Sequence, residues 1–497
     1  MSGGGFGCVD STVTIRGCTF SENKAQYSGP YGFPLPNGQG GGAIFCRQST
    51  STIENNTIQS NTIPGAYANG AGILLTSSTA TVTGNTITQN TATGNGGNGG
   101  GLLAVNGTAT ISGNTVTNNT ANASAGIGCY SCPVTINANT ITGNTGSALQ
   151  VNGPPVPLGE WIDVTIAGNK ISNNTGFAVF CNWGVDVAMT ENEITGNSCP
   201  GDQGGGVNWS SGVRGTIANN TISSNYSGYF GGGIMLSTTE EGVVVTGNTI
   251  SDNTAKYVAG GMHLWNTGGT IANNTITRNH ANGISSMEIW EGGGAIFANV
   301  PLVPLLITGN TISDNTSAQD GGAIHLVQTA SFSTPVTFSG NTITGNTAVN
   351  GGAVSWYEGD QLKAVFTGNT ISDNTATAKG GAFYCTRQCA GSITGGRIEN
   401  NRVTAGSGGA IYCEDGSNVP ITNVILAGNT ATGKGGAIAS TNSAPVIVSS
   451  TLAANSAAEG GAFYCTWDAP TGTAPRIRNS ILWGNTAALG PRSALTP

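Results

Sequence analysis

Acidic residues close to tryptophans come nearest to a catalytic pattern in this chain. A sugar-cleaving site is built from two carboxyl groups, one acting as the acid and the other as base or nucleophile. No acid pair recurs in register in neighbouring copies of the repeat described below, and solvated loop charges are the commoner explanation. The pattern therefore favours a non-catalytic protein, and the alternative is a polysaccharide-active enzyme, a lyase or glycoside hydrolase using Glu358 and Asp360. The pairs are Glu160 and Asp163, Glu240 and Glu241, Glu288 and Glu291, Glu358 and Asp360, and Glu414 and Asp415, with Trp161, Trp290 and Trp356 near several of them.

The eleven cysteines are the second reactive group. Cys8 and Cys46 lie in successive copies of the repeat, within reach of a disulfide, but a small apolar side chain explains the same position. No histidine accompanies the Cys129-x-x-Cys132 pair, so we predict no metal site and no cofactor. Seven cysteines share one position that is predicted to face inward: Cys8, Cys46, Cys129, Cys181, Cys385, Cys413 and Cys465.

The composition excludes several classes of partner. The 497 residues include 80 glycines and only 8 % charged residues, with a formal net charge of -8. Nucleic acids and anionic membranes attract clustered Lys and Arg, but the 16 basic residues here are scattered. We predict no nucleic-acid partner, and no membrane insertion by this segment because no apolar run reaches the length of a span.

Two signatures alternate along the whole chain. The first is Gly-Gly-Ala followed by an aliphatic residue, as at Gly321-Gly322-Ala323-Ile324; counting degenerate copies, it recurs seventeen times, about every 29 residues. The second is Gly-Asn-Thr-Ile-x-x-Asn, whose final Asn is present in every copy. Asn tolerates left-handed backbone conformations, and an inward amide can hydrogen-bond its counterparts above and below. We predict a structural ladder of Asn23, Asn61, Asn90, Asn119, Asn144, Asn174, Asn197, Asn225, Asn253, Asn279, Asn315, Asn346, Asn374, Asn401, Asn429, Asn455 and Asn485.

Short strands with a period of two lie between these signatures. One coil of about 29 residues cannot bury its own apolar face, but stacked coils share a continuous core. The sequence therefore predicts an all-β fold, a right-handed parallel β-helix of about seventeen coils. We expect one domain over 1–497, cut from a longer secreted protein, because both ends lack an evident cap.

An aromatic stripe is the predicted binding surface. The variable position after each Gly-Gly-Ala-aliphatic signature is predicted to face solvent, and it carries many aromatic residues. Exposed apolar rows can stack on glycan rings or dock a protein, although stacking between coils explains the same pattern. The candidate binding residues are Phe45, Phe180, Phe297, Tyr384, Tyr412 and Tyr464.

Outward threonines form a second regular row, beginning at Thr57 and Thr86. A flat threonine array can bind ice, but Lys170, Glu193 and Arg397 interrupt this one. High β-propensity explains the threonines without a ligand.

The pairing of Gly-Gly-Ala-Ile with an apolar-x-x-Asn motif resembles the repeats of the bacterial polymorphic outer-membrane proteins. Phe20-Ser21-Glu22-Asn23 matches that family's second motif, and the resemblance covers essentially the whole chain. It implies a passenger exported to the extracellular space or the bacterial cell surface, serving as a stalk or adhesin. The expected partners are a glycan or a protein of a host or neighbouring cell, and self-assembly into filaments through the coil ends is a third hypothesis.

Overall fold

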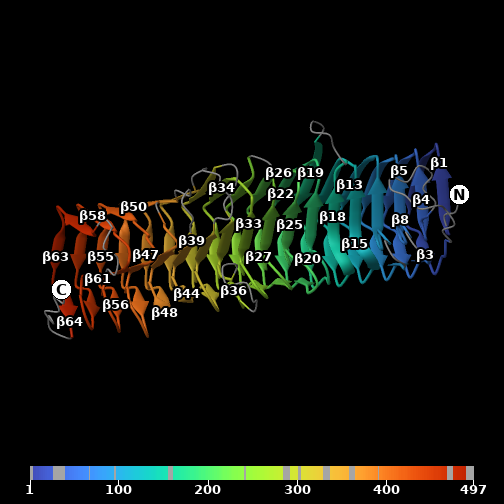
Figure 1. The fold of residues 1–497 in the computed structure, drawn as a ribbon. Helices are drawn as coiled ribbons and strands as arrows, with labels where there is room; N and C mark the ends of the chain where they lie inside the picture. The colour runs from blue at the N-terminus through green and yellow to red at the C-terminus, as the bar shows by residue number, and fades with distance from the viewer. Residues whose placement is uncertain are drawn as a thin grey trace. The chain divides into compact units, whose positions relative to one another are not determined.

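The fold is seen in a computed structural model of the chain. The structure describes residues 4–25, 40–65, 68–93, 97–154, 161–239, 242–283, 291–299, 304–327, 336–357, 364–389, 391–466 and 474–488. These residues form β-strands joined by turns, with no helix among them. The chain divides into two compact units, the first made of Met1–Gly228 and Gly233–Val243 and the second of Tyr229–Gly232 and Val244–Pro497. Within each unit the strands stack as parallel coils (Figure 1), which confirms the predicted right-handed parallel β-helix.

One coil contains three main strands and a short fourth one. In the coil that begins at β8 (Ile73–Thr76), the chain continues through β9 (Thr79–Thr83), β10 (Thr86–Thr88) and β11 (Thr91–Ala92). Strand β9 alternates between exposed threonines and buried Ala80 and Val82. This alternation is the period of two that the sequence shows, and it directs the apolar residues into the core.

Each unit has three long parallel sheets, named A, B and C after the order of the strands in a coil. In the first unit, sheet A contains β1 (Phe6–Val9), β4 (Ile44–Arg47), β8, β12 (Leu102–Val105), β15 (Thr120–Tyr130), β18 (Thr145–Asn152), β21 (Val179–Asn182), β25 (Val207–Ser210) and β29 (Ile234–Ser237). Sheet B contains β2 (Thr12–Arg16), β5 (Thr50–Glu54), β9, β13 (Thr108–Ser112), β16 (Val134–Asn137), β19 (Ile162–Ala167), β22 (Val185–Thr190) and β26 (Val213–Ala218). Sheet C contains β3 (Thr19–Ser21), β6 (Thr57–Gln59), β10, β14 (Thr115–Thr117), β17 (Thr140–Thr142), β20 (Lys170–Ser172), β23 (Glu193–Thr195) and β27 (Thr221–Ser223).

The second unit repeats this arrangement. Its sheet A contains β33 (Met262–Trp265), β37 (Ile296–Asn299), β41 (Ile324–Val327), β45 (Val354–Tyr357), β49 (Phe383–Thr386), β53 (Ile411–Cys413), β57 (Ile438–Thr441) and β61 (Phe463–Thr466). Sheet B contains β30 (Val244–Thr246), β34 (Gly269–Ala272), β38 (Leu305–Thr308), β42 (Val336–Ser339), β46 (Val365–Thr367), β50 (Ser392–Thr394), β54 (Pro420–Thr422), β58 (Val446–Val448) and β62 (Arg476–Arg478). Sheet C contains β31 (Thr249–Ser251), β35 (Thr275–Thr277), β39 (Thr311–Ser313), β43 (Thr342–Thr344), β47 (Thr370–Ser372), β51 (Arg397–Glu399), β55 (Ile425–Ala427), β59 (Thr451–Ala453) and β63 (Ile481–Trp483).

The Gly-Gly signature marks a corner where successive coils approach closely. Gly351 has a φ of 62°, in the left-handed region that favours glycine. A Cβ on Gly352 would lie 2.3 Å from the carbonyl oxygen of Gly381 in the next coil. The first glycine is therefore required because of its left-handed backbone conformation, and the second because a side chain would collide with the next coil.

The predicted asparagine ladder is present in both units. The Oδ1 atom of Asn315 accepts hydrogen bonds from the backbone N–H and the Nδ2 of Asn279, at 2.9 and 3.0 Å. Its Nδ2 donates to the carbonyl of Ile276 in the preceding coil and to Oδ1 of Asn346 in the following one. The same side-chain bond joins Asn23 through Asn225 in the first unit and Asn253 through Asn485 in the second.

The left-handed backbone conformation predicted for the ladder asparagines is wrong. The residue with a left-handed backbone is the one before the ladder position, as at Ser60 and Asp314, with a φ of 55° at each. The ladder Asn is therefore selected for its amide and not for its backbone conformation.

A second asparagine ladder, which was not predicted, runs parallel to the first. It is formed by the Asn directly before the third strand of a coil, which is the Asn of Gly-Asn-Thr in most of these coils. Nδ2 of Asn85, for example, donates to Oδ1 of Asn114 at 3.0 Å and to the carbonyl of Ile53 at 2.8 Å. Its members are Asn56, Asn85, Asn114, Asn139, Asn169, Asn192 and Asn220 in the first unit, and Asn248, Asn274, Asn310, Asn341 and Asn369 in the second.

The inward position of sheet A holds the residues that were predicted there, with one exception. Trp209 and Trp356 are fully buried. Cys8 lies opposite Cys46, and Cys385 opposite Cys413, all four as buried thiols. Cys465 occupies the predicted position, in register with the buried Ser440 of the preceding coil, but it is exposed. It lies on β61, the last sheet A strand among the described residues.

Replacing a central ladder residue should strand several buried groups at once. Asn315→Ala would remove the acceptor of the Asn279 N–H and the donor to two carbonyl oxygens. Each stranded buried group costs about 1–3 kcal/mol, so we expect the free energy of unfolding in urea to fall by at least about 3 kcal/mol. The matched control is Thr311→Ala, an exposed position on the neighbouring strand β39, which should cost well under about 1 kcal/mol. Equal effects of the two substitutions would contradict the ladder.

Candidate functional sites on the outer faces

The outer face of sheet A in the second unit carries a row of rings in contact with one another. His263 lies between Phe230 and Phe297, with ring centroids 5.2 and 4.9 Å away. Phe297 contacts His325 at 5.3 Å, and His325 contacts Tyr357 at 5.2 Å. Parallel register produces the middle of this row, because His263, Phe297 and His325 occupy one position of successive strands.

The predicted exposure of the aromatic stripe is wrong at three of its six positions. Phe45 is 1 % exposed, Phe297 0 % and Tyr384 6 %, while Phe180, Tyr412 and Tyr464 are half-buried. Phe45 packs with Leu74 and Leu103 of the next two coils. The side chains point outward, but neighbours in the same column cover them.

Three tyrosines at the C-terminal part of this row form what we call the tyrosine stripe: Tyr384 on β49, Tyr412 on β53 and Tyr464 on β61. The Nζ of Lys379 lies 5.3 Å from the ring centroid of Tyr384 and 5.2 Å from that of Tyr412. The Nζ of Lys434 lies 4.4 Å from the Tyr464 ring and donates a 2.7 Å hydrogen bond to its hydroxyl. That hydrogen bond raises the pKa of Lys434. Two ammonium groups therefore flank half-buried tyrosine rings.

Glu414 is held within this stripe by two donors. Lys379 Nζ lies 2.8 and 2.7 Å from its two carboxylate oxygens, and the Tyr384 hydroxyl donates to Oε1 at 2.5 Å. Burial raises the pKa of Tyr384, and the hydrogen bond to Glu414 raises it further. Glu414 therefore acts as a fixed anchor for Lys379 and Tyr384.

The other acidic candidates are dispersed. Asp415 accepts a hydrogen bond from the Thr386 hydroxyl at 2.9 Å, and Glu291 is buried in the second unit. Asp163 lies exposed on β19 in the first unit. Six acids and one tryptophan lie outside the described residues, including both residues of the enzymatic alternative: Glu160, Glu240, Glu241, Glu288, Trp290, Glu358 and Asp360.

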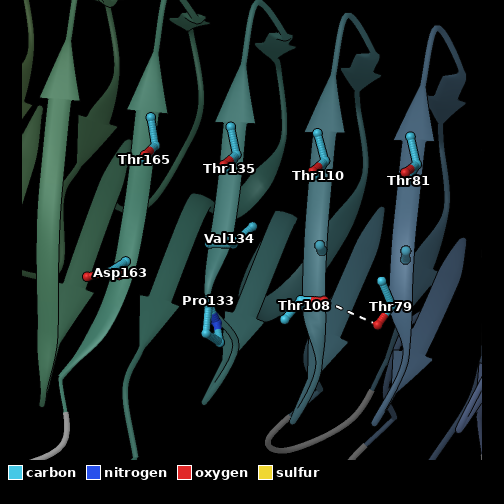
Figure 2. A pocket seen from close by; sticks show the side chains of 11 residues that line it. Thr79, Thr81, Thr108, Thr110, Pro133, Val134, Thr135, Asp163 and Thr165 are labelled. Atoms are coloured by element: carbon cyan, nitrogen blue, oxygen red, sulfur yellow. Dashed lines mark hydrogen bonds between the residues drawn. The ribbon is translucent and has the colours of Figure 1, made fainter. Parts of the chain in front are cut away.

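A hollow on the outer face of sheet B in the first unit is the second candidate site, which we call the threonine hollow (Figure 2). It has a volume of about 310 Å³. Four neighbouring strands, β9, β13, β16 and β19, present Thr81, Thr110, Thr135 and Thr165 in one row, as Figure 2 shows. The lining residues are Thr79, Ala80, Thr81, Thr108, Ala109, Thr110, Pro133, Val134, Thr135, Asp163 and Thr165.

Charged and aromatic groups lie beside this hollow. Asp163 pairs in register with Asp186, and Asp186 with Arg214. The Nε of Arg214 donates to Asp186 at 2.8 Å, and its guanidinium lies 4.5 Å from the ring centroid of Trp161. The sequence singled out Asp163 and Trp161, but it gave no signal for the hollow because Thr-x-Thr pairs are common in strands.

Comparisons with known proteins give the family but no close relative. The model of the right-handed beta helix region matches residues 1–153, 125–371 and 322–490. No curated protein matches the chain, and neither does any solved structure. Among the described residues, no helix is long and apolar enough to cross a membrane.

The buried histidine in the ring row should make stability depend on pH. Burial lowers the pKa of His263 from 6.5 to about 3, so the folded chain keeps it neutral while the unfolded chain protonates it below about pH 6.5. Lowering the pH from 6.5 towards 3 therefore favours the unfolded state, by up to about 1.4 kcal/mol per pH unit. Urea unfolding at a series of pH values should show a shallower loss for His263→Phe, which keeps a ring in the stack. The same pH dependence in both chains would contradict a neutral, buried His263.

Proposed function

Because the chain belongs to the family of right-handed β-helix regions, we propose that it is a non-catalytic, extracellular β-helix that binds glycans as an adhesin-like stalk. The tyrosine stripe of the second unit is its binding surface. The observation that carries the proposal is the pair of half-buried rings, Tyr412 and Tyr464, each with a lysine ammonium close to its ring.

Half-buried tyrosines suit a saccharide because one part of the ring offers apolar area while the hydroxyl forms hydrogen bonds. The Tyr412 hydroxyl lies 3.2 Å from the Thr441 hydroxyl, and Lys434 fixes the hydroxyl of Tyr464. Both rings are therefore held in place before a ligand arrives, which lowers the entropy cost of binding.

The state of two carboxylates in the second unit supports binding over catalysis. A glycoside-cleaving pair needs one carboxyl that donates a proton and a second that acts as base or nucleophile. Glu414 is neutralised by Lys379 at 2.7 Å, and Asp320 accepts hydrogen bonds from Tyr357 and Asn350 at 2.5 and 2.9 Å. The enzymatic alternative rests on Glu358 and Asp360.

The cellular setting is part of the proposal. The resemblance to polymorphic outer-membrane protein repeats supports an exported passenger on a bacterial cell surface, where a glycan of a host or neighbouring cell is the ligand. The -8 net charge agrees with a partner other than nucleic acid.

Ring removal should weaken glycan binding without unfolding the stack. In a glycan-array and titration assay on the purified chain, Tyr412→Ala and Tyr464→Ala should each raise the Kd about tenfold or more, because interface tyrosines often contribute over 1 kcal/mol. Tyr412→Phe should keep most of the affinity, since the ring remains. Tyr226→Ala, at a half-buried tyrosine of the first unit, is the control.

Four outcomes would contradict the proposal. Unchanged affinity in both alanine variants would remove the stripe as the binding surface, and capture of a protein but no glycan would change the class of partner. Depolymerisation of a polysaccharide by the native chain, lost in Glu358→Gln, would establish the enzymatic alternative. Particles much longer than one chain in light scattering would instead favour the filament hypothesis.

A further inference from the structure

We propose that the threonine hollow of the first unit is a separate binding site for a neutral oligosaccharide. It goes beyond the proposed function because it lies in the other unit and uses hydroxyl groups and one carboxylate in place of tyrosine rings. Its volume of about 310 Å³ is at the lower end of the range for small-molecule sites, so it suits a short stretch of a sugar chain.

The floor of the hollow is a grid of hydroxyl and methyl groups. Thr79 and Thr81 project from β9, and Thr108 and Thr110 occupy the same positions on β13. Neighbouring strands are about 4.8 Å apart, and alternate residues of one strand about 6.8 Å apart. Each hydroxyl offers one donor and two acceptor positions. Sugar hydroxyls also donate and accept hydrogen bonds, so a sugar chain on this grid would find hydrogen-bonding partners at regular intervals.

Most of this hydrogen-bonding capacity is free for a ligand. Thr79 and Thr81 of β9 and Thr108 and Thr110 of β13 are exposed, and Thr108 donates a 3.3 Å hydrogen bond to Thr79 (Figure 2). The row from Thr81 to Thr165 crosses four strands, a span of about 14 Å at this spacing. A chain lying along the row would contact one threonine per coil.

Asp163 supplies the charged acceptor of the site. Among the described residues it has no ion pair, whereas its column neighbour Asp186 is paired with Arg214 at 2.8 Å. An ionised carboxylate can accept hydrogen bonds from two neighbouring sugar hydroxyls, and such charge-assisted bonds are stronger than neutral ones. The same charge repels uronates and sulfated sugars, so it favours a neutral ligand.

The grid is poorly suited to an extended flat lattice such as ice. In the column that starts with Thr79 and Thr108, the next two coils place Pro133 and Asp163 at the edge of the hollow, as Figure 2 shows. A bounded hollow with one carboxylate fits a discrete ligand better than a repeating surface.

The test measures binding of neutral hexasaccharides of glucose, N-acetylglucosamine and mannose to the full chain by calorimetry, with hexagalacturonate as the charged comparison. We expect at least one neutral hexasaccharide to bind and hexagalacturonate to bind at least tenfold more weakly. Thr110→Val keeps the β-branched shape and removes one hydroxyl, and Asp163→Asn removes the charge. Each should raise the Kd for the neutral ligand about tenfold, and Asp163→Asn should also reduce the discrimination against hexagalacturonate.

The matched control is Thr14→Val, in the same threonine column on β2 but outside the hollow; it should leave the Kd unchanged. Equal urea midpoints for all variants would show that the coils remain folded. Absence of binding by every neutral hexasaccharide, or an unchanged Kd in both Thr110→Val and Asp163→Asn, would overturn the site. The double variant Tyr412→Ala/Tyr464→Ala separates the two proposals: binding that survives it belongs to the hollow, and binding that disappears with it belongs to the tyrosine stripe alone.

Discussion

The amide hydrogen bonds of the asparagine ladders are the constraint on which the rest of this fold depends. Each coil must turn sharply around a narrow core, and a turn exposes backbone N–H and carbonyl groups to an interior without water. The side chain of Asn315 satisfies two such groups: it accepts a hydrogen bond from the backbone N–H of Asn279 and donates one to the carbonyl of Ile276. Because one side chain serves backbone groups of neighbouring coils, its bonds are lost unless those coils lie in register.

Because the coils are in fixed register, residues at one position of successive strands form a column. These columns make up the outer surfaces of the sheets. The ring row around His263 and Phe297, the threonine row from Thr81 to Thr165 and the ion pair of Asp186 with Arg214 all arise from identical positions in successive strands. At the threonine hollow, Pro133 and Asp163 interrupt a column of threonines. At the tyrosine stripe, Lys379 and Lys434 come from a different column and lie beside the rings.

The two candidate surfaces differ in how their polar groups are used. In the tyrosine stripe, Lys379, Glu414 and Tyr384 satisfy one another, so the rings are fixed and the charges are largely balanced. In the threonine hollow, the hydroxyls and Asp163 keep most of their capacity for partners. The first surface offers preformed apolar area, and the second offers hydrogen bonds, which is why the ligands proposed for them differ.

The sequence by itself determined the fold class and one asparagine ladder, because in a solenoid each repeat of the sequence contains the residues that one coil needs. Asn315 and its counterparts recur once per coil, and strand alternation placed Trp209 and Trp356 inward. The second ladder could also be predicted from the sequence, since Asn85 belongs to the same repeated motif as Asn90. Only the tertiary structure decided which outward residues are exposed: Phe297 and Tyr384 point outward and are covered. It also decided that Lys379 forms an ion pair with Glu414 and that threonines of four strands line a hollow. These features depend on distances between coils, and residues more than twenty positions apart acquire such distances only when the stack forms.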